Sequence, residues 1–152
     1  RRPAEVMGIH FFNAGPVMKL VELVKTITTS EESVSIARKF AESLGKQPIL
    51  AKDSPGFIVN LLLVPFLLDA IRAYQNGLAS REDIDAGVKL GLNHPMGPLA
   101  LTDLVGLDTT LFIADAMYAE TKDPKYAAPT LLRKMVAAGW YGRKSGKGFY
   151  DY

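Results

Sequence analysis

Two residues near the amino terminus carry side chains that could together move a proton. His10 lies in the apolar segment 6–12 and Glu22 in the apolar segment 18–24, and both segments have the composition of strands. If the two strands pair antiparallel about Pro16, the register places His10 opposite Glu22. A carboxylate beside an imidazole fixes the tautomer of the ring, so the pair is a candidate general base. A purely structural histidine is the alternative.

Asn60 is the next candidate, because it interrupts an apolar run at residues 57–71. An amide left without hydrogen bonds there would cost about 1–3 kcal/mol. It therefore bonds either a neighbouring backbone group or a substrate oxygen near a domain junction. The other histidine, His94, precedes a proline in a loop and is interpreted as structural or surface. Lys144 and Lys147 are expected to be solvated, with contact to a phosphate as the alternative.

Two regions of different character must position these residues. Strands are predicted at 6–12, 18–24 and 48–51, and a helix at 30–44 opened by a capping box of Thr29 and Glu32. Ser54 followed by Pro55 then predicts the start of a second, buried helix that Pro65 should kink. Further helices are predicted at 80–90, 98–105, 109–120 (capped by Asp108) and 130–138, before a glycine-rich basic loop at 142–152. The organisation is an α/β piece at 1–52 and an all-helical domain at 53–152.

The composition of the chain excludes several classes of site and of protein. The chain has 152 residues, a net charge of +2 and no cysteine, which excludes a disulfide scaffold, a thiolate metal site and a cysteine nucleophile. The near balance of charge argues against a general nucleic-acid binder. The middle of the chain is acidic and both flanks are basic, which favours either complementary faces or a basic flank that meets an anionic ligand.

Several nucleotide and hydrolase signatures are absent from the sequence. It contains no Gly-x-Gly-x-x-Gly fingerprint, no P-loop, no His-Glu-x-x-His and no Gly-x-Ser-x-Gly elbow. The amino terminus carries no apolar segment of the signal-peptide type, and the first residue is Arg1 rather than methionine. We therefore expect the chain to be a piece of a longer protein.

Four motifs together resemble the 3-hydroxyacyl-CoA dehydrogenase family, and within it the bacterial 3-hydroxybutyryl-CoA branch. They are GIHFFNAGPVMKLVE at 8–22, DSPGFIVN at 53–60, HPMGP at 94–98 and GKGFY at 146–150. The resemblance runs over essentially the whole chain but matches only the second half of such a protein. It implies a mostly helical fold: an all-helical dimerisation domain of the 6-phosphogluconate dehydrogenase C-terminal-like type, preceded by the last strands and helix of a truncated Rossmann domain.

The resemblance also implies roles for particular positions. His10 matches the catalytic histidine that takes the C3 hydroxyl proton of an (S)-3-hydroxyacyl-CoA while a hydride passes to NAD or NADP. Glu22 matches its carboxylate partner, and Asn60 an asparagine near the reacting oxygens. Asn13 and Lys144 match cofactor contacts. No metal site is implied.

The resemblance implies partners as well. They are 3-hydroxyacyl-CoA or acetoacetyl-CoA and further copies in a homodimer or larger homo-oligomer, with no nucleic acid and no membrane. The location implied is the cytoplasm, or the mitochondrial matrix in a eukaryote. Two positions depart from the family pattern: Leu61 stands where arginine is common, and Ala14 where proline is common.

Three hypotheses follow. The first is the carboxyl-terminal portion of an NAD(P)-dependent 3-hydroxyacyl-CoA dehydrogenase, inactive alone because half of the cofactor site is missing. The second is a non-catalytic dimerisation module. The third is a related dehydrogenase that acts on a hydroxy acid without CoA. A truncated sheet would expose an edge and an apolar face, so we expect a partner copy to cover them.

Overall fold

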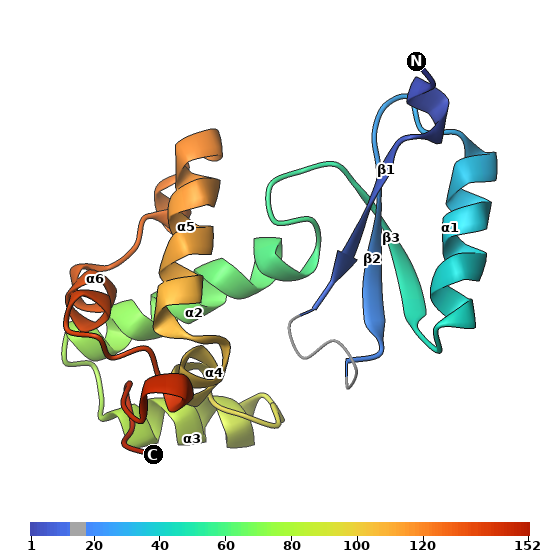
Figure 1. The fold of residues 1–152 in the computed structure, drawn as a ribbon. Coiled ribbons are helices and arrows are strands. Elements are labelled where there is room, and N and C mark those ends of the chain that lie inside the picture. Colours follow the sequence, from blue (N-terminus) through green and yellow to red (C-terminus); the bar gives the residue numbers. More distant parts are fainter. Residues whose placement is uncertain (13–17) are drawn as a thin grey trace. The chain divides into compact units, whose positions relative to one another are not determined.

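The structure, a computed structural model, describes residues 1–12 and 18–152. Two compact units make up the chain, Arg1–Val59 and Asn60–Tyr152, and Figure 1 shows their elements. The predicted cofactor contact Asn13 and the family departure Ala14 lie outside the described residues.

A three-stranded sheet forms the centre of the first unit. The elements of this unit are η1 (Pro3–Glu5), β1 (Met7–Phe11), β2 (Leu20–Lys25), α1 (Glu31–Ser43) and β3 (Gln47–Lys52). The strand order is β1-β2-β3, with an antiparallel first pair and a parallel second pair. The three predicted strands are confirmed, and so is the register, because His10 lies opposite Glu22.

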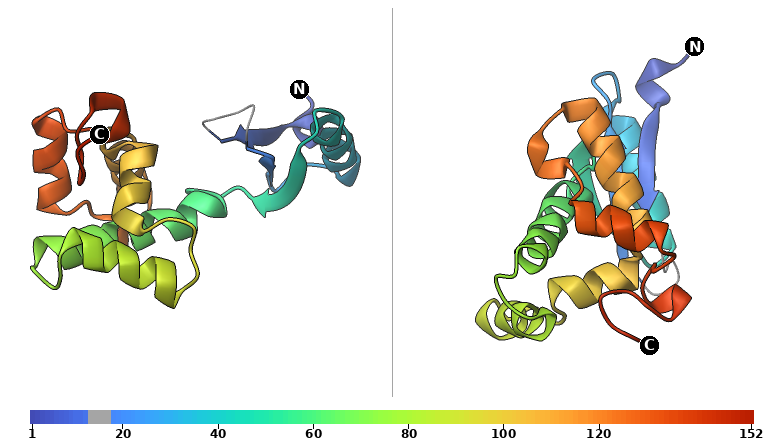
Figure 2. Two further views of the ribbon diagram at one scale, coloured as in Figure 1. Left: turned by 90° about the horizontal axis from the view of Figure 1, so that it is seen from below. Right: turned by 90° about the vertical axis from the view of Figure 1, so that its left-hand side faces the viewer.

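Helix α1 lies against one face of the sheet (Figures 1 and 2). The predicted capping box is wrong by one residue, because the N-cap is Ser30, whose hydroxyl accepts from the N–H of Ser33. Thr29 is occupied elsewhere: its hydroxyl donates to the backbone carbonyl of Val6 at 2.6 Å. A small hydrophobic core lies between α1 and the sheet, where Val21, Leu23, Ala37 and Ala41 are buried together.

Helix α2 (Val59–Gln75) is the first helix of the helical unit and contributes to its core, although its first residue belongs to the first unit. The prediction that Ser54 caps this helix is wrong: a turn separates the two, and the Ser54 hydroxyl donates to the carbonyl of Lys52 instead. Pro65 lies inside the helix. Among the described residues, no helix is long and apolar enough to cross a membrane.

Helices and short turns form the rest of the second unit. They are α3 (Arg81–Gly91), α4 (Pro98–Val105), α5 (Leu107–Thr121), η2 (Pro124–Tyr126), α6 (Thr130–Ala137) and η3 (Arg143–Ser145). The predicted helices are confirmed with small shifts of their ends. Asp108 is not the cap of α5, however, because Gly106 holds that position and Asp108 lies in the first turn. The core of the unit gathers side chains from α2, α4, α5 and α6 around Leu68, Leu99 and Leu132.

Two buried carboxylates organise the carboxyl-terminal segment. Asp103 on α4 accepts from the N–H groups of Phe149 and Tyr150 at 2.8 and 2.9 Å, and from the hydroxyl of Tyr152. Asp85 on α3 accepts from the first N–H groups of α4 and from the Tyr150 hydroxyl. The tail is therefore a fixed part of the helical unit, where the sequence had favoured a basic loop.

Candidate functional site

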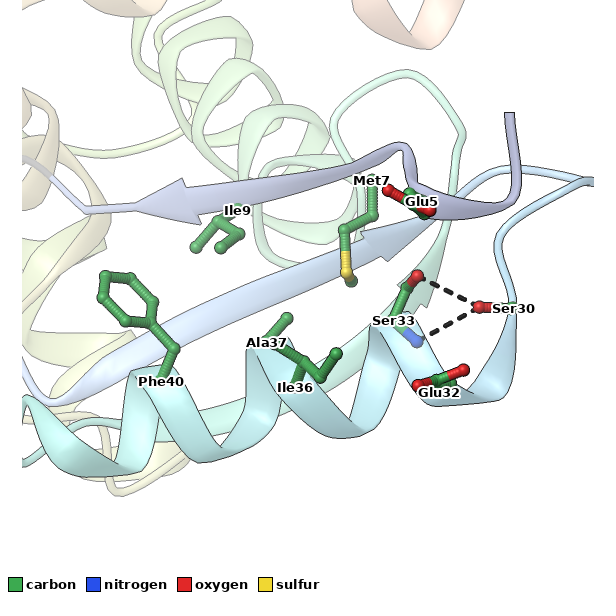
Figure 3. A pocket seen from close by; sticks show the side chains of 9 residues that line it. All are labelled: Glu5, Met7, Ile9, Ser30, Glu32, Ser33, Ile36, Ala37 and Phe40. Carbon is green, nitrogen blue, oxygen red and sulfur yellow. Dashed lines mark hydrogen bonds between the residues drawn. The ribbon is translucent and has the colours of Figure 1, made fainter. Parts of the chain in front are cut away.

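The side chain of His10 lies on the face of the sheet away from α1. Met7 and Ile9 point toward α1 in Figure 3. Successive side chains of a strand point to opposite faces, so His10 points to the other face. That face is where Glu22 of β2 lies directly opposite it.

His10 and Glu22 form one hydrogen-bonded pair. The Nδ1 atom of His10 lies 2.7 Å from Oε2 of Glu22. An ionised carboxylate only accepts, so Nδ1 carries the proton and Nε2 retains its lone pair. The His10 side chain is 29% exposed and the Glu22 side chain is fully buried. Among the described residues, Nε2 has no hydrogen-bond partner, which leaves this nitrogen able to accept a proton from a bound molecule.

The second oxygen of Glu22 is held by the backbone that leads into α2. The N–H groups of Ile58 and Val59 donate to Oε1 at 3.0 and 2.9 Å. The first N–H groups of a helix lack partners within it and carry partial positive charge. These two donors therefore satisfy the second oxygen of the buried carboxylate, and the carboxylate beside Nδ1 can stabilise a positive charge on the ring during proton transfer.

Two aromatic rings surround His10 that sequence reasoning did not assign to the site. The ring centroid of Phe12 lies 4.7 Å from that of the imidazole and the centroid of Phe57 lies 5.4 Å from it. Phe12 could have been found, since it lies two residues from His10 and so on the same strand face. Phe57 is 47 positions away, and no periodicity in the sequence links it to His10.

Asn60 is the second residue of α2 and belongs to the helical unit. Among the described residues, its side-chain amide has no hydrogen bond, so the bond to a neighbouring backbone group, one of the two expected alternatives, is not formed. Leu61, which stands where the family often has arginine, packs against the core of the helical unit. His94 is exposed, as predicted, and its ring centroid lies 5.6 Å from that of Phe66.

Lys144 is paired rather than freely solvated. Its Nζ atom lies 2.6 and 2.8 Å from the two carboxylate oxygens of Asp108. Burial by itself would raise the pKa of Asp108, but the hydrogen bonds from Lys144 and from the N–H of Thr109 bring the pKa below its usual value. Lys147 also has partners, since it lies 4.3 Å above the ring of Trp140 and 3.8 Å from Asp151.

Two surface hollows lie away from these residues. The first, of about 460 Å³, lies between β1 and α1 and is lined by apolar, hydroxyl and carboxylate side chains (Figure 3). The second, of about 250 Å³, lies between α2, α6 and the tail. Neither is lined by His10, Glu22, Asn60 or Lys144. In the described part of the chain, no three histidine or acidic side chains gather in a way that could hold a metal ion.

Comparison with known proteins gives two adjoining family matches. Residues 1–54 match the NAD-binding domain of 3-hydroxyacyl-CoA dehydrogenase, and residues 56–152 match the C-terminal domain of the same family.

Among curated relatives, the 3-hydroxybutyryl-CoA dehydrogenase of Mycobacterium tuberculosis is 54% identical over 153 residues, which cover 100% of this chain and 54% of the relative. The human mitochondrial hydroxyacyl-coenzyme A dehydrogenase is 51% identical and covers 95% of this chain and 46% of its own length. The chain thus spans about half the length of these relatives.

Solved structures show the same similarity. The crystal structure of Mycobacterium tuberculosis FadB2 superposes with a TM-score of 0.94 at 54% identity, covering 100% of this chain and 54% of that one. The crystal structure of (S)-3-hydroxybutyryl-CoA dehydrogenase PaaH1 from Ralstonia eutropha gives 0.90 at 51% identity, covering 96% and 52%. The mostly helical fold with a sheet from an NAD-binding domain is therefore confirmed.

Proposed function

The chain belongs to the 3-hydroxyacyl-CoA dehydrogenase family, and on that premise we propose that it supplies the general base of an enzyme that oxidises the C3 hydroxyl of an (S)-3-hydroxyacyl-CoA to a ketone. One observation carries the proposal: His10 is held through Nδ1 by the buried Glu22, while Nε2 has no partner among the described residues. The names of the relatives favour a short substrate such as 3-hydroxybutyryl-CoA.

In this proposal the proton moves from the substrate hydroxyl to Nε2 of His10. The imidazole then carries a positive charge, which the carboxylate of Glu22 stabilises from the other side of the ring. Glu22, which is already held by two backbone N–H groups, orients the imidazole and does not take the proton itself. Asn60, whose amide has no hydrogen bond within the described residues, is proposed to orient a substrate oxygen.

The cofactor of the proposed reaction is NAD or NADP, which when bound supplies the acceptor of the hydride. The chain fits this group only in part. It matches an NAD-binding domain over residues 1–54, yet it contains no glycine-rich dinucleotide fingerprint. We therefore assign no phosphate-binding loop to these residues. Asn13 and Lys144 remain proposed contacts, and Lys144 would exchange its bond to Asp108 for one to the nucleotide.

The test uses a chimera in which the segment preceding the matched region of the Mycobacterium tuberculosis relative is joined ahead of Arg1. The chimera should reduce acetoacetyl-CoA with oxidation of NADH, followed by absorbance. His10→Gln should lower kcat by about 10²–10⁴-fold, the usual contribution of a general base. His94→Gln is the matched control and should retain full turnover. Wild-type turnover by the His10→Gln variant would show that His10 is not the general base. The 152-residue chain alone is expected to show no such activity.

A non-catalytic dimerisation module is the second candidate. Large apolar side chains are exposed on the helical unit, among them Leu62, Leu90 and Phe112, and where such side chains form a contiguous patch they mark an association site. This candidate predicts a dimer by light scattering and no binding of NAD⁺ by calorimetry. A dimer that also gains turnover in the chimera would favour the enzyme.

A further inference from the structure

The backbone at Phe57 adopts a conformation that phenylalanine rarely takes. Its φ is +50°, and the preceding Gly56 has a φ of +78°. Glycine tolerates this left-handed region because it lacks a Cβ, whereas a bulky residue there is a genuine outlier. Such outliers persist only where surrounding contacts hold them, and they cluster at functional sites. Contacts on both sides of Phe57 should therefore hold this turn.

Hydrogen bonds hold the turn at both ends. The N–H of Phe57 donates to the carbonyl of Ser54 at 3.0 Å. The next two N–H groups, of Ile58 and Val59, donate to Oε1 of Glu22. The buried carboxylate thus fixes the backbone immediately after Phe57, and Glu22 stabilises a left-handed turn that the chain would otherwise avoid.

The same carboxylate fixes one edge of the His10 ring. Its other oxygen lies 2.7 Å from Nδ1. A bond at one edge still permits the imidazole to tilt about that bond, and the contact with the ring of Phe57, at an interplanar angle of 56°, limits the tilt. Phe12 adds a second ring contact, at 51°. Glu22 therefore holds both the imidazole and the backbone that presents a ring to it.

Packing of the hydrophobic core does not account for this arrangement. The described core of the first unit consists of Val21, Leu23, Ala37 and Ala41 with Met7 and Ile9 packed against it, and Phe57 is not a member. Its aromatic contact is with His10. A residue needed only for bulk would not require a strained backbone beside the candidate base.

We propose that Phe57 is a positioning residue that sets the plane of the His10 imidazole, and that the turn at Gly56 and Phe57, held by Glu22, exists to place its ring there. The inference rests on the proposed function, because a general base needs its lone pair aimed at the substrate. It adds to that function a residue that acts through His10 and transfers no proton itself.

The first test is nuclear magnetic resonance of the 152-residue chain with ¹⁵N-labelled histidine, which gives one pair of imidazole ¹⁵N signals for each of the two histidines. In Phe57→Leu, we expect the ¹⁵N shifts of Nδ1 and Nε2 of His10 to converge, because an unsupported ring leaves Glu22 part of the time. Phe57→Tyr keeps the ring and should restore the wild-type shifts. Phe66→Leu is the matched control: it removes the ring beside His94 and should leave the His10 signals unchanged.

The second test is the kinetics of the chimera. Phe57→Leu should lower kcat about tenfold with KM within twofold, because misorientation of a reacting group affects the chemical step. Phe57→Tyr should restore kcat, and Phe66→Leu should not change it. Backbone amide shifts of β1 to β3 report whether the variant keeps its fold, and Phe57→Met is the substitute if leucine unfolds it.

The two proposals fail separately. If the wild-type chimera has no turnover, the proposed function is wrong, and the imidazole shifts measured on the 152-residue chain still decide the role of Phe57. If the chimera turns over while a folded Phe57→Leu or Phe57→Met variant retains wild-type kcat and imidazole shifts, the positioning role is overturned.

Discussion

Oε2 of Glu22 lies 2.7 Å from Nδ1 of His10, while Oε1 of the same carboxylate accepts two backbone N–H groups near the start of α2. One buried side chain therefore joins two strands of the sheet to a segment 36 residues further along the chain. The tautomer of the imidazole and the path of the backbone into α2 depend on the same group.

Glu22→Gln should exchange the tautomer of His10. The amide oxygen can still accept from Ile58 and Val59, so the NH₂ group faces Nδ1 and donates to it, which moves the ring proton to Nε2. The free energy of unfolding should fall by about 1–3 kcal/mol because a charge-assisted acceptor is lost. Histidine ¹⁵N shifts and urea unfolding measure both effects. Glu5→Gln, at an exposed side chain, is the control and should change neither quantity.

Gly148→Ala should destabilise the helical unit. A Cβ at this position would overlap the Asp103 carboxylate and the backbone of Gly142, which displaces the acceptor of two buried N–H groups. We expect a loss of about 2–3 kcal/mol in urea unfolding. Gly87→Ala provides the contrast, because its Cβ meets nothing within 4 Å and a helix interior favours alanine by about 0.5–1 kcal/mol. Equal stability of the two variants would contradict the account of the tail.

Stability should fall at alkaline pH through two tyrosines. Burial and the hydrogen bond to Asp85 raise the pKa of Tyr150, and burial and the hydrogen bond to Asp103 raise the pKa of Tyr152. The folded state thus favours the neutral phenols. Their contribution is fully present below the ordinary tyrosine pKa of about 10 and is lost as pH rises through the folded-state values.

Urea unfolding between pH 8 and 11.5 measures this loss. Tyr150→Phe should be less stable than wild type at pH 8 and show a shallower decline above pH 10. Tyr118→Phe, at an exposed ring, should follow the wild-type curve. A wild-type decline as shallow as that of Tyr150→Phe would count against the effect.

The ion pair of Asp108 and Lys144 should contribute at neutral pH and disappear in acid. The pKa of Asp108 is lowered in the fold despite its partial burial, because Lys144 and a backbone N–H bond the carboxylate. Its contribution is present above the ordinary value of about 3.9 and is lost as pH falls through the folded-state pKa. Both side chains are more than a third exposed, so the pair contributes less than about 1 kcal/mol.

A double-mutant cycle with Asp108→Asn and Lys144→Met isolates this contribution. We expect a favourable coupling energy at pH 7, weaker in 1 M salt, and none at pH 2. A coupling energy that persists at pH 2 would show that the two residues interact other than by charge.

Local patterns predicted most of the elements. Apolar segments bounded by glycine and proline gave the three strands, and the pairing of His10 with Glu22 followed from the length of the chain between them. The predicted helix N-caps were less reliable than the predicted strands. Ser54 precedes a proline, as an N-cap often does, yet the two left-handed residues that follow it delay α2 until Val59. The next two N–H groups, of Ile58 and Val59, donate to Glu22, which is far away in sequence.

Local patterns also could not predict the hydrogen-bond partners of the buried carboxylates. Asp103 lies among apolar residues of α4, so, like Asn60, it would need hydrogen-bond partners if buried. Its partners, in the segment 149–152, could not be named, because they are more than 40 residues away and two are backbone groups.

The sequence by itself determined the family, the elements and the pairing of His10 with Glu22, because motifs, periodicity and strand register are local or nearly local properties. Only the tertiary structure decided that Phe57 contacts the imidazole, that Glu22 holds the start of α2, and that Asp85 and Asp103 fix the tail. The contacts of Glu22, Asp85 and Asp103 each join distant segments through a buried carboxylate. Burial makes an unpaired charge costly, so each buried carboxylate needs hydrogen-bond donors. These donors come from whichever segments pack beside it in the fold, and the spacing of residues along the chain does not identify those segments.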